Sequence, residues 1–327
     1  MVLTSLLLGV GAAILALTVH ELGHLVAGLA VGFRFSLFAI GPLLVERTPA
    51  GGIRLAWNRV PSFFGGVAGT LPTSAEGLRG RFAVVALGGP LASALLALAA
   101  HGVLAWLVPS HGWLRVSWSW VRLLSAAVFI GTVLPLPNGS FVTDGLRLIR
   151  ILKPGPGGDR EVSLLSLAAL EQGGVRPREW DASLIERGLG VRDGSIFECQ
   201  LHLHAYMRAL DSGMLDSARA SLDMARSLRV PQFLRAPCLV EAAYFEAAHH
   251  GDPKRARELL DQVRPGTYGV LAADRLRAEA AIAVAEGDTR TANEKISAAL
   301  EKSPAWAAGP RAWLAALANS QRSGPLA

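Results

Sequence analysis

Three long apolar stretches dominate the first half of the chain. They cover residues 5–31, 82–108 and 118–136, and each approaches or exceeds the roughly 20 residues that a helix needs to cross a bilayer. Beyond residue 155, charged and apolar residues alternate as they do in soluble helical proteins. The pattern predicts a transmembrane core over residues 1–153, a linker with amphipathic helices over 154–194, and a soluble helical domain over 195–320.

A different pattern separates the first two apolar stretches. Residues 33–37 and 53–57 alternate apolar with polar side chains, and the sequence Pro-Ala-Gly-Gly at 49–52 lies between them. Alternation of this kind predicts a small β-hairpin at the membrane surface within residues 33–60. A free strand edge there would accept an extended peptide by strand addition. A hairpin that only caps the helices fits the pattern equally well.

The last third of the chain contains a weak repeat. Three glycines are spaced 38 and then 36 residues apart, with an alanine five residues and an apolar residue nine residues after each. The repeated positions are Gly213, Ala218, Leu222; Gly251, Ala256, Leu260; and Gly287, Ala292, Ile296. Helix–turn–helix repeats have a period of about 34 residues. The spacing predicts tetratricopeptide-like helices over 195–320 that bind a cytosolic peptide or protein partner, although a plain helical bundle without a ligand also fits.

Composition and charge agree with a membrane protein. Hydrophobic residues make up 51% of the chain and the mean hydropathy is +0.36, while the net charge of +6 comes largely from arginines beside the apolar stretches. Basic loops stay in the cytoplasm. We therefore expect a multi-pass protein of the cell membrane, with the N-terminus outside and the C-terminal domain cytoplasmic. The same rule explains the positive charge without nucleic-acid binding, and we expect no nucleic-acid partner.

The first apolar stretch contains His20-Glu21-Leu22-Gly23-His24. A central charge in a membrane segment costs roughly 2.5–3.5 kcal/mol on insertion scales. Residues four apart lie on one face of a helix, so His20 and His24 can offer two imidazole nitrogens to one ion. Glu21 projects at the edge of the same site, as in the H-E-x-x-H motif of zinc hydrolases. A coincidental match, with these groups paired to other helices, is disfavoured because ionisable residues inside a membrane are usually functional.

A catalytic zinc site needs a third protein ligand. The best remaining candidate is Asp144, which follows the third apolar stretch and opens a helix predicted over residues 146–152. Its alternative role is that of a helix N-cap. His24 lies about eight residues from the cytoplasmic end of its stretch, or ~12 Å at 1.5 Å per residue. The ion would thus lie below the membrane surface but within reach of cytosolic water.

These residues, together with Gly89-Pro90 and the Pro135, Pro137 … Asp144-Gly145 element, resemble the site-2 protease family of intramembrane zinc metalloproteases. The resemblance covers about residues 1–153. It implies one Zn²⁺ held by His20, His24 and Asp144, with Glu21 as the general base. It also implies cleavage of transmembrane segments of single-pass membrane proteins, usually in regulated intramembrane proteolysis. The family commonly has asparagine where this chain has Ser93 and Thr132; these two residues and Asn138 are the predicted substrate-binding positions.

The sequence therefore predicts an all-α membrane protein in which a three-span, site-2-protease-like core with a small surface hairpin precedes a soluble α-helical repeat domain. Its predicted activity is that of an intramembrane zinc endopeptidase. A catalytically inactive, membrane-anchored scaffold of the same fold is the alternative, favoured by Ser93 and Thr132. A metal transporter is a weaker alternative, because only one apolar stretch carries the ionisable motif. Cys199 and Cys238 belong to no metal-binding pattern and are expected to be reduced and buried.

Overall fold

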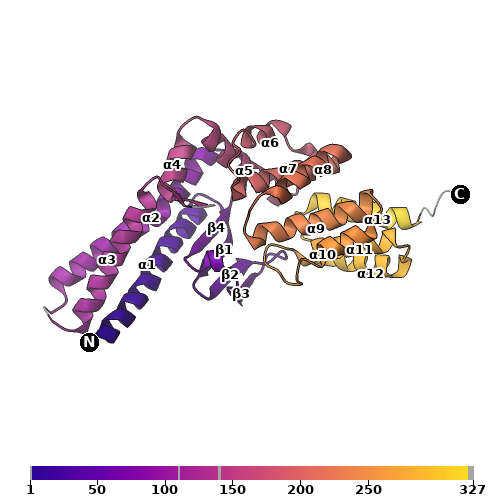
Figure 1. The fold of residues 1–327 in the computed structure, drawn as a ribbon. Helices are drawn as coiled ribbons and strands as arrows, with labels where there is room; N and C mark the ends of the chain where they lie inside the picture. The colour runs from indigo at the N-terminus through magenta and orange to yellow at the C-terminus, as the bar shows by residue number, and fades with distance from the viewer. Residues whose placement is uncertain (1, 110, 139–140, 323–327) are drawn as a thin grey trace. The chain divides into compact units, whose positions relative to one another are not determined.

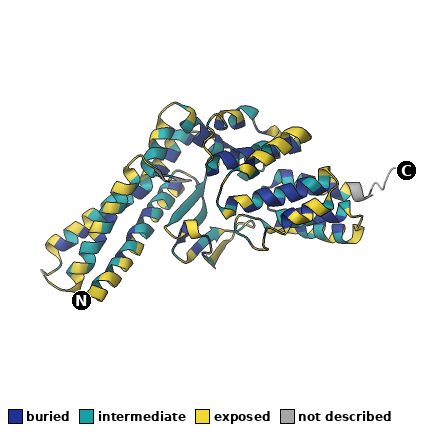
Figure 2. Ribbon diagram, in the orientation of Figure 1, coloured by how far each residue is buried: buried dark blue, intermediate teal, exposed yellow. Residues whose placement is uncertain are grey.

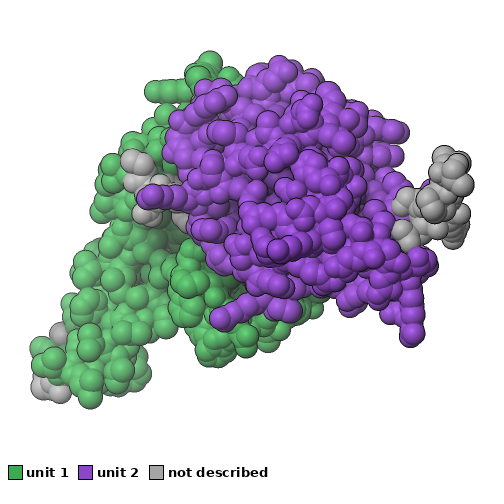
Figure 3. Space-filling model, turned by 45° about the vertical axis from the view of Figure 1, so that its right-hand side comes forward, with its two compact units in different colours: residues 1–165 green, residues 166–327 purple. Residues whose placement is uncertain are grey.

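The computed structural model describes residues 2–109, 111–138 and 141–322. The chain is mostly helical, with one small four-stranded sheet (Figure 1). It divides into two compact units, unit 1 over residues 1–165 and unit 2 over residues 166–327 (Figure 3).

Among the described residues, three helices are long and apolar enough to cross a membrane: α1 (Val2–Ala30), α2 (Leu78–Trp106) and α3 (Trp113–Val133). They pack on one another within unit 1. Many of their side chains are exposed although they are apolar, which suits a lipid environment (Figure 2). The three predicted spans are confirmed as apolar helices, with shifted ends. α2 begins four residues earlier than predicted, where Arg81 donates a hydrogen bond to the Val31 carbonyl oxygen at 2.9 Å.

The backbones of α1 and α2 touch at two glycines. A Cβ atom added to Gly23 would lie 2.3 Å from the carbonyl oxygen of Gly88, and one added to Gly88 would lie 2.4 Å from that of Gly23. Small residues permit such close approach between membrane helices. The contact falls within the His20–His24 motif, so α2 passes directly beside the predicted metal ligands.

The strands form an antiparallel sheet of order β3-β2-β1-β4. Its members are β1 (Arg34–Ile40), β2 (Leu43–Arg47), β3 (Ile53–Trp57) and β4 (Val67–Leu71), with the short helix η1 (Pro61–Phe63) before β4. The predicted hairpin is therefore wrong in its pairing, because β2 lies between β1 and β3. Gly41 has a φ of +50° and, with Pro42, forms a two-residue turn that folds the chain back immediately after β1.

The third membrane helix leads into the segment that carries Asp144. The two-residue strands β5 (Pro137–Asn138) and β6 (Phe141–Val142) pair antiparallel and precede α4 (Asp144–Leu152) and α5 (Pro156–Gln172). The buried Ile151 of α4 joins a hydrophobic cluster with Phe82 of α2 and Phe33. This packing holds α4 against the apolar helix α2 of unit 1.

Unit 2 consists of short helices. They are η2 (Pro177–Glu179), α6 (Ala182–Gly188), α7 (Ile196–Asp211), α8 (Leu215–Ser227), α9 (Gln232–His249), α10 (Pro253–Leu260), α11 (Ala272–Ala285), α12 (Thr289–Lys302) and α13 (Ala308–Arg322). Helix α7 packs on α8, α9 on α10, and α11 on α12.

The repeated glycines and alanines have the predicted places in these helix pairs. Gly213, Gly251 and Gly287 follow α7, α9 and α11 with positive φ angles. The alanine five residues after each glycine is completely buried. Helix ends and inward-facing alanines are thus confirmed, whereas these features do not by themselves test the tetratricopeptide-like class.

The core of unit 2 contains a charged residue as well as apolar ones. Arg277 is 0% exposed, contacts the rings of both Tyr244 and Trp313, and pairs with Glu241. Cys199 and Cys238 are free and buried, as expected, with their Sγ atoms 3.8 Å apart.

Candidate metal centre and active site

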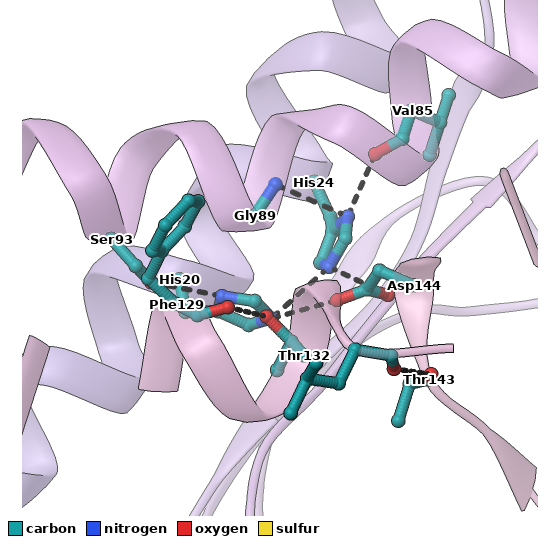
Figure 4. A network of polar contacts seen from close by, with 10 residues as sticks. His20, His24, Val85, Gly89, Ser93, Phe129, Thr132, Thr143 and Asp144 are labelled. Atoms are coloured by element: carbon teal, nitrogen blue, oxygen red, sulfur yellow. Dashed lines mark hydrogen bonds and ion pairs between the residues drawn. The ribbon is translucent and has the colours of Figure 1, made fainter. Parts of the chain in front are cut away.

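Two histidines of α1 and one aspartate of α4 meet inside unit 1 (Figure 4). The Nε2 atom of His20 lies 3.2 Å from Oδ2 of Asp144, and Nε2 of His24 lies 3.3 Å from Oδ1 of the same carboxylate. The two Nε2 atoms are 3.3 Å apart. One ligand atom from each residue therefore points to a common place, as the sequence predicted.

These distances fit a zinc ion. Tetrahedral sites with metal–nitrogen bonds of about 2.0–2.1 Å place neighbouring ligand atoms about 3.3–3.4 Å apart. The donor set of two imidazole nitrogens and one carboxylate oxygen is also one that zinc prefers, and it leaves a fourth position open. His20 is 4% exposed, so the site is shielded on the side of α2.

The opposite nitrogens of both imidazoles have protein partners. Nδ1 of His24 lies 2.7 Å from the carbonyl oxygen of Val85, which can only accept. With an ion bound, Nδ1 would therefore keep the proton and Nε2 would present its lone pair to the ion. Nδ1 of His20 lies 2.9 Å from the hydroxyl oxygen of Ser93. Partners of this kind fix the orientation and tautomer of metal-binding histidines.

Gly89 of α2 makes room for His24. A Cβ atom at this position would lie 2.3 Å from Nε2 of His24, which is far closer than atoms can approach. The glycine of the Gly89-Pro90 element thus lies directly against a ligand imidazole.

We expect Gly89→Ala to displace the His24 ring and to lower the zinc content of the purified protein severalfold. The matched control is Gly102→Ala, on the same helix, where an added Cβ would meet no atom within 4 Å. Elemental analysis of both variants measures the effect. Equal zinc content in the two variants would contradict this account of Gly89.

The position of Asp144 depends on its two neighbours. The Thr143 hydroxyl donates to the carbonyl oxygen of Leu134 at 2.6 Å and accepts from the N–H of Leu136 at 3.1 Å. At Gly145, a Cβ atom would lie 1.8 Å from the Val133 carbonyl oxygen. The Asp-Gly sequence is therefore explained by contact between the start of α4 and the end of α3.

The Asp144 carboxyl is ionised at neutral pH. Burial alone would raise its pKa, but hydrogen bonds with His20 and His24 outweigh burial and hold the pKa below its usual range. An ionised carboxylate is the form that binds a metal ion.

Glu21 lies against β4. Its carboxylate accepts a hydrogen bond from the backbone N–H of Ala68, and a Cβ atom on Gly66 would lie 2.9 Å from Cγ of Glu21. Glu21 is partly accessible, unlike His20. A carboxylate held beside three convergent ligands can exchange protons with a water molecule in the site.

The three predicted substrate-binding residues have different surroundings. Ser93 is 0% exposed and contacts His20. The Thr132 hydroxyl lies 3.4 Å from the carbonyl oxygen of Phe129, near the end of α3 (Figure 4). The backbone of Asn138 pairs with Phe141, whereas its side chain lies outside what the structure describes. A role in holding substrate stays a prediction for all three.

Several backbone contacts of the site have no sequence signal of their own. The Val85 carbonyl group and the Ala68 N–H belong to apolar residues, which sequence patterns do not associate with chemistry. The glycines at 66 and 145 offer the only hint, since glycine marks places where chains approach closely.

The family comparison covers most of the chain. The sequence profile of Peptidase family M50 matches residues 8–305, and thus includes the ligands, the membrane helices and most of unit 2. No curated protein matches the chain, and no solved structure matches it. The comparison gives no support for tetratricopeptide-like repeats, so that assignment stays a prediction. A match of this extent, together with a His-His-Asp group in apolar helices, shows that the chain belongs to peptidase family M50, the site-2 protease family of zinc-dependent intramembrane metalloproteases.

Proposed function

We propose that this protein cuts peptide bonds within transmembrane segments of single-pass membrane proteins, in regulated intramembrane proteolysis. In this proposal His20, His24 and Asp144 hold one zinc ion and Glu21 is the general base. The observation that carries it is the convergence of three ligand atoms beside a carboxylate, on a helix of membrane-spanning length.

The ion and the side chains have separate tasks. When bound, zinc polarises the scissile carbonyl group and lowers the pKa of its water ligand. Glu21 accepts a proton from the attacking water and donates it to the leaving amine nitrogen as the peptide bond breaks. The Val85 carbonyl group and the Ser93 hydroxyl keep the two imidazoles in the orientation that presents Nε2.

The substrate must be extended where it is cut, because the peptide bonds of a helix are shielded by the helix itself. β4 suits this task, since it is an edge strand of the sheet and contacts Glu21. An extended peptide can add to such an edge by backbone hydrogen bonds. This supports the sequence-based prediction of strand addition, now with β4 as the edge concerned.

The site is reached from the cytoplasmic side in this proposal. His24 lies six residues before the end of α1, or about 9 Å at 1.5 Å per residue. The basic connection between α1 and α2 places that end in the cytoplasm by the positive-inside rule. Unit 2 is then cytoplasmic, where its helices recruit a peptide or protein partner.

Reconstituted protein and a single-pass model substrate test the proposal. We expect cleavage at a bond inside the transmembrane segment, complete loss of cleavage after chelation of zinc, and recovery when zinc is added back. Mass spectrometry of the products locates the bond. Cuts confined to the soluble tails would contradict the proposal, and zinc-loaded protein that cuts no substrate would favour the inactive scaffold.

A further inference from the structure

A small cavity lies within unit 2, apart from the metal centre. Its volume is about 160 Å³, and it is bordered by the end of α8 and by α9 and α10. Apolar side chains such as the buried Leu239 and Leu259 form part of its lining. Three arginines complete it, one from each helix: Arg226, Arg235 and Arg255.

The positive charge at this cavity is not fully compensated by the residues that the structure describes. The guanidinium group of the exposed Arg235 makes no ion pair or hydrogen bond with any of them. Nε of Arg226 is buried without a hydrogen-bond partner.

Two acidic side chains lie close to these arginines. Asp223 contacts Arg226 at 3.2 Å, and Glu258 contacts Arg255 at 2.9 Å. Both carboxylates are about half exposed, and neither lines the cavity. The three guanidinium groups therefore carry one more positive charge than these two carboxylates neutralise. A bound anion would balance the difference.

We propose that this cavity binds the phosphate group of a small molecule, either inorganic phosphate or a small phosphomonoester. Guanidinium groups present planar, paired N–H donors that match phosphate oxygens. A phosphate oxygen would supply the acceptor that the guanidinium group of Arg235 lacks among the described residues. In a phosphomonoester, an apolar group attached to the phosphate would contact Leu239 and Leu259.

Calorimetry on the full chain in a phosphate-free detergent tests the site. The probes are inorganic phosphate and phenyl phosphate, with phenol as the neutral control. We expect both anions to bind and phenol not to bind. Tighter binding of phenyl phosphate identifies a phosphomonoester as the ligand, and tighter binding of inorganic phosphate identifies the free anion. The absence of binding by both anions overturns the proposal.

Substitutions locate the binding. Arg235→Ala and Arg255→Ala should each lower phosphate affinity by about tenfold or more, which is the scale of a lost charge-assisted hydrogen bond. Gln262→Glu, which adds a negative charge to the lining, should weaken binding as well.

The matched control is Arg290→Ala on α12, which removes the same charge from a side chain that is 90% exposed. Its affinity should equal that of the unsubstituted protein. An equal loss in Arg290→Ala and Arg235→Ala would mean nonspecific attraction and would overturn the proposal. Circular dichroism verifies that each variant is folded. Because the readout is binding, Glu21→Gln should bind phosphate normally, which separates this inference from the peptidase activity.

Discussion

Glu21→Gln should lower peptide hydrolysis by about 10²–10⁴-fold, the range that general acid–base catalysis contributes, while zinc stays bound. Glutamine has nearly the same shape but cannot accept the proton of the attacking water. Glu21 is not one of the three convergent ligands, so the metal content should remain that of the unsubstituted protein. Single-turnover cleavage of a single-pass substrate, combined with elemental analysis, measures both quantities.

Glu76→Gln is the matched control for this substitution. Glu76 is exposed in the loop before α2, and the change removes the same charge from the same unit without touching the site. Its cleavage rate should be unaltered. Unchanged turnover in zinc-loaded Glu21→Gln would refute the assignment of Glu21 as the base.

Asp144→Ala should remove both zinc and activity. The substitution deletes one of three protein ligands, so we expect zinc affinity to fall by more than the roughly 10–100-fold cost of losing an outer hydrogen-bond partner. Ser93→Ala measures this smaller loss of zinc affinity, because Ser93 contacts the ligand His20 and not the ion position itself. Competition with a chelator of known affinity measures the zinc dissociation constant of each variant.

The control for Asp144→Ala is Asp216→Ala, which removes an exposed carboxylate in the first turn of α8. It should leave zinc affinity and cleavage unaltered. Full zinc occupancy of Asp144→Ala in the presence of the chelator would show that another residue completes the site.

The membrane helices and the His-Glu-x-x-His motif could be predicted because their signals are local. A stretch of about 20 apolar residues specifies a span by itself, and two histidines four apart share a helix face whatever surrounds them. Asp144 is different, since it lies more than a hundred residues from His24. Only the need for a third ligand and the family resemblance singled it out before the structure placed it beside the imidazoles.

The sheet was harder to predict because its signals are weak or misleading. The apolar Leu43-Leu44-Val45 run of β2 does not alternate with polar residues, so the sequence pattern did not identify it as a strand. The prediction therefore paired the segment of β1 with that of β3. β4 is five residues long and contains Gly69, which favours neither strand nor helix. Strand order depends on pairing between segments, and a single sequence records little of that.

The contacts that orient the ligands could not be predicted from side-chain types. The Val85 carbonyl oxygen binds His24, and the Val133 carbonyl oxygen lies where only glycine fits at position 145. Every residue has a carbonyl group, so nothing in the sequence distinguishes these two. The buried Arg277 in unit 2 is a similar case, since arginine is expected at surfaces.

The close contact between Gly145 and the end of α3 has a mechanical consequence. Because no side chain fits between Gly145 and the Val133 carbonyl oxygen, any larger residue at position 145 would push the start of α4, and with it the Asp144 carboxylate, away from the end of α3. Activity therefore depends on a residue that never touches the ion, and a substitution there should inactivate the protein without removing any of its ligands.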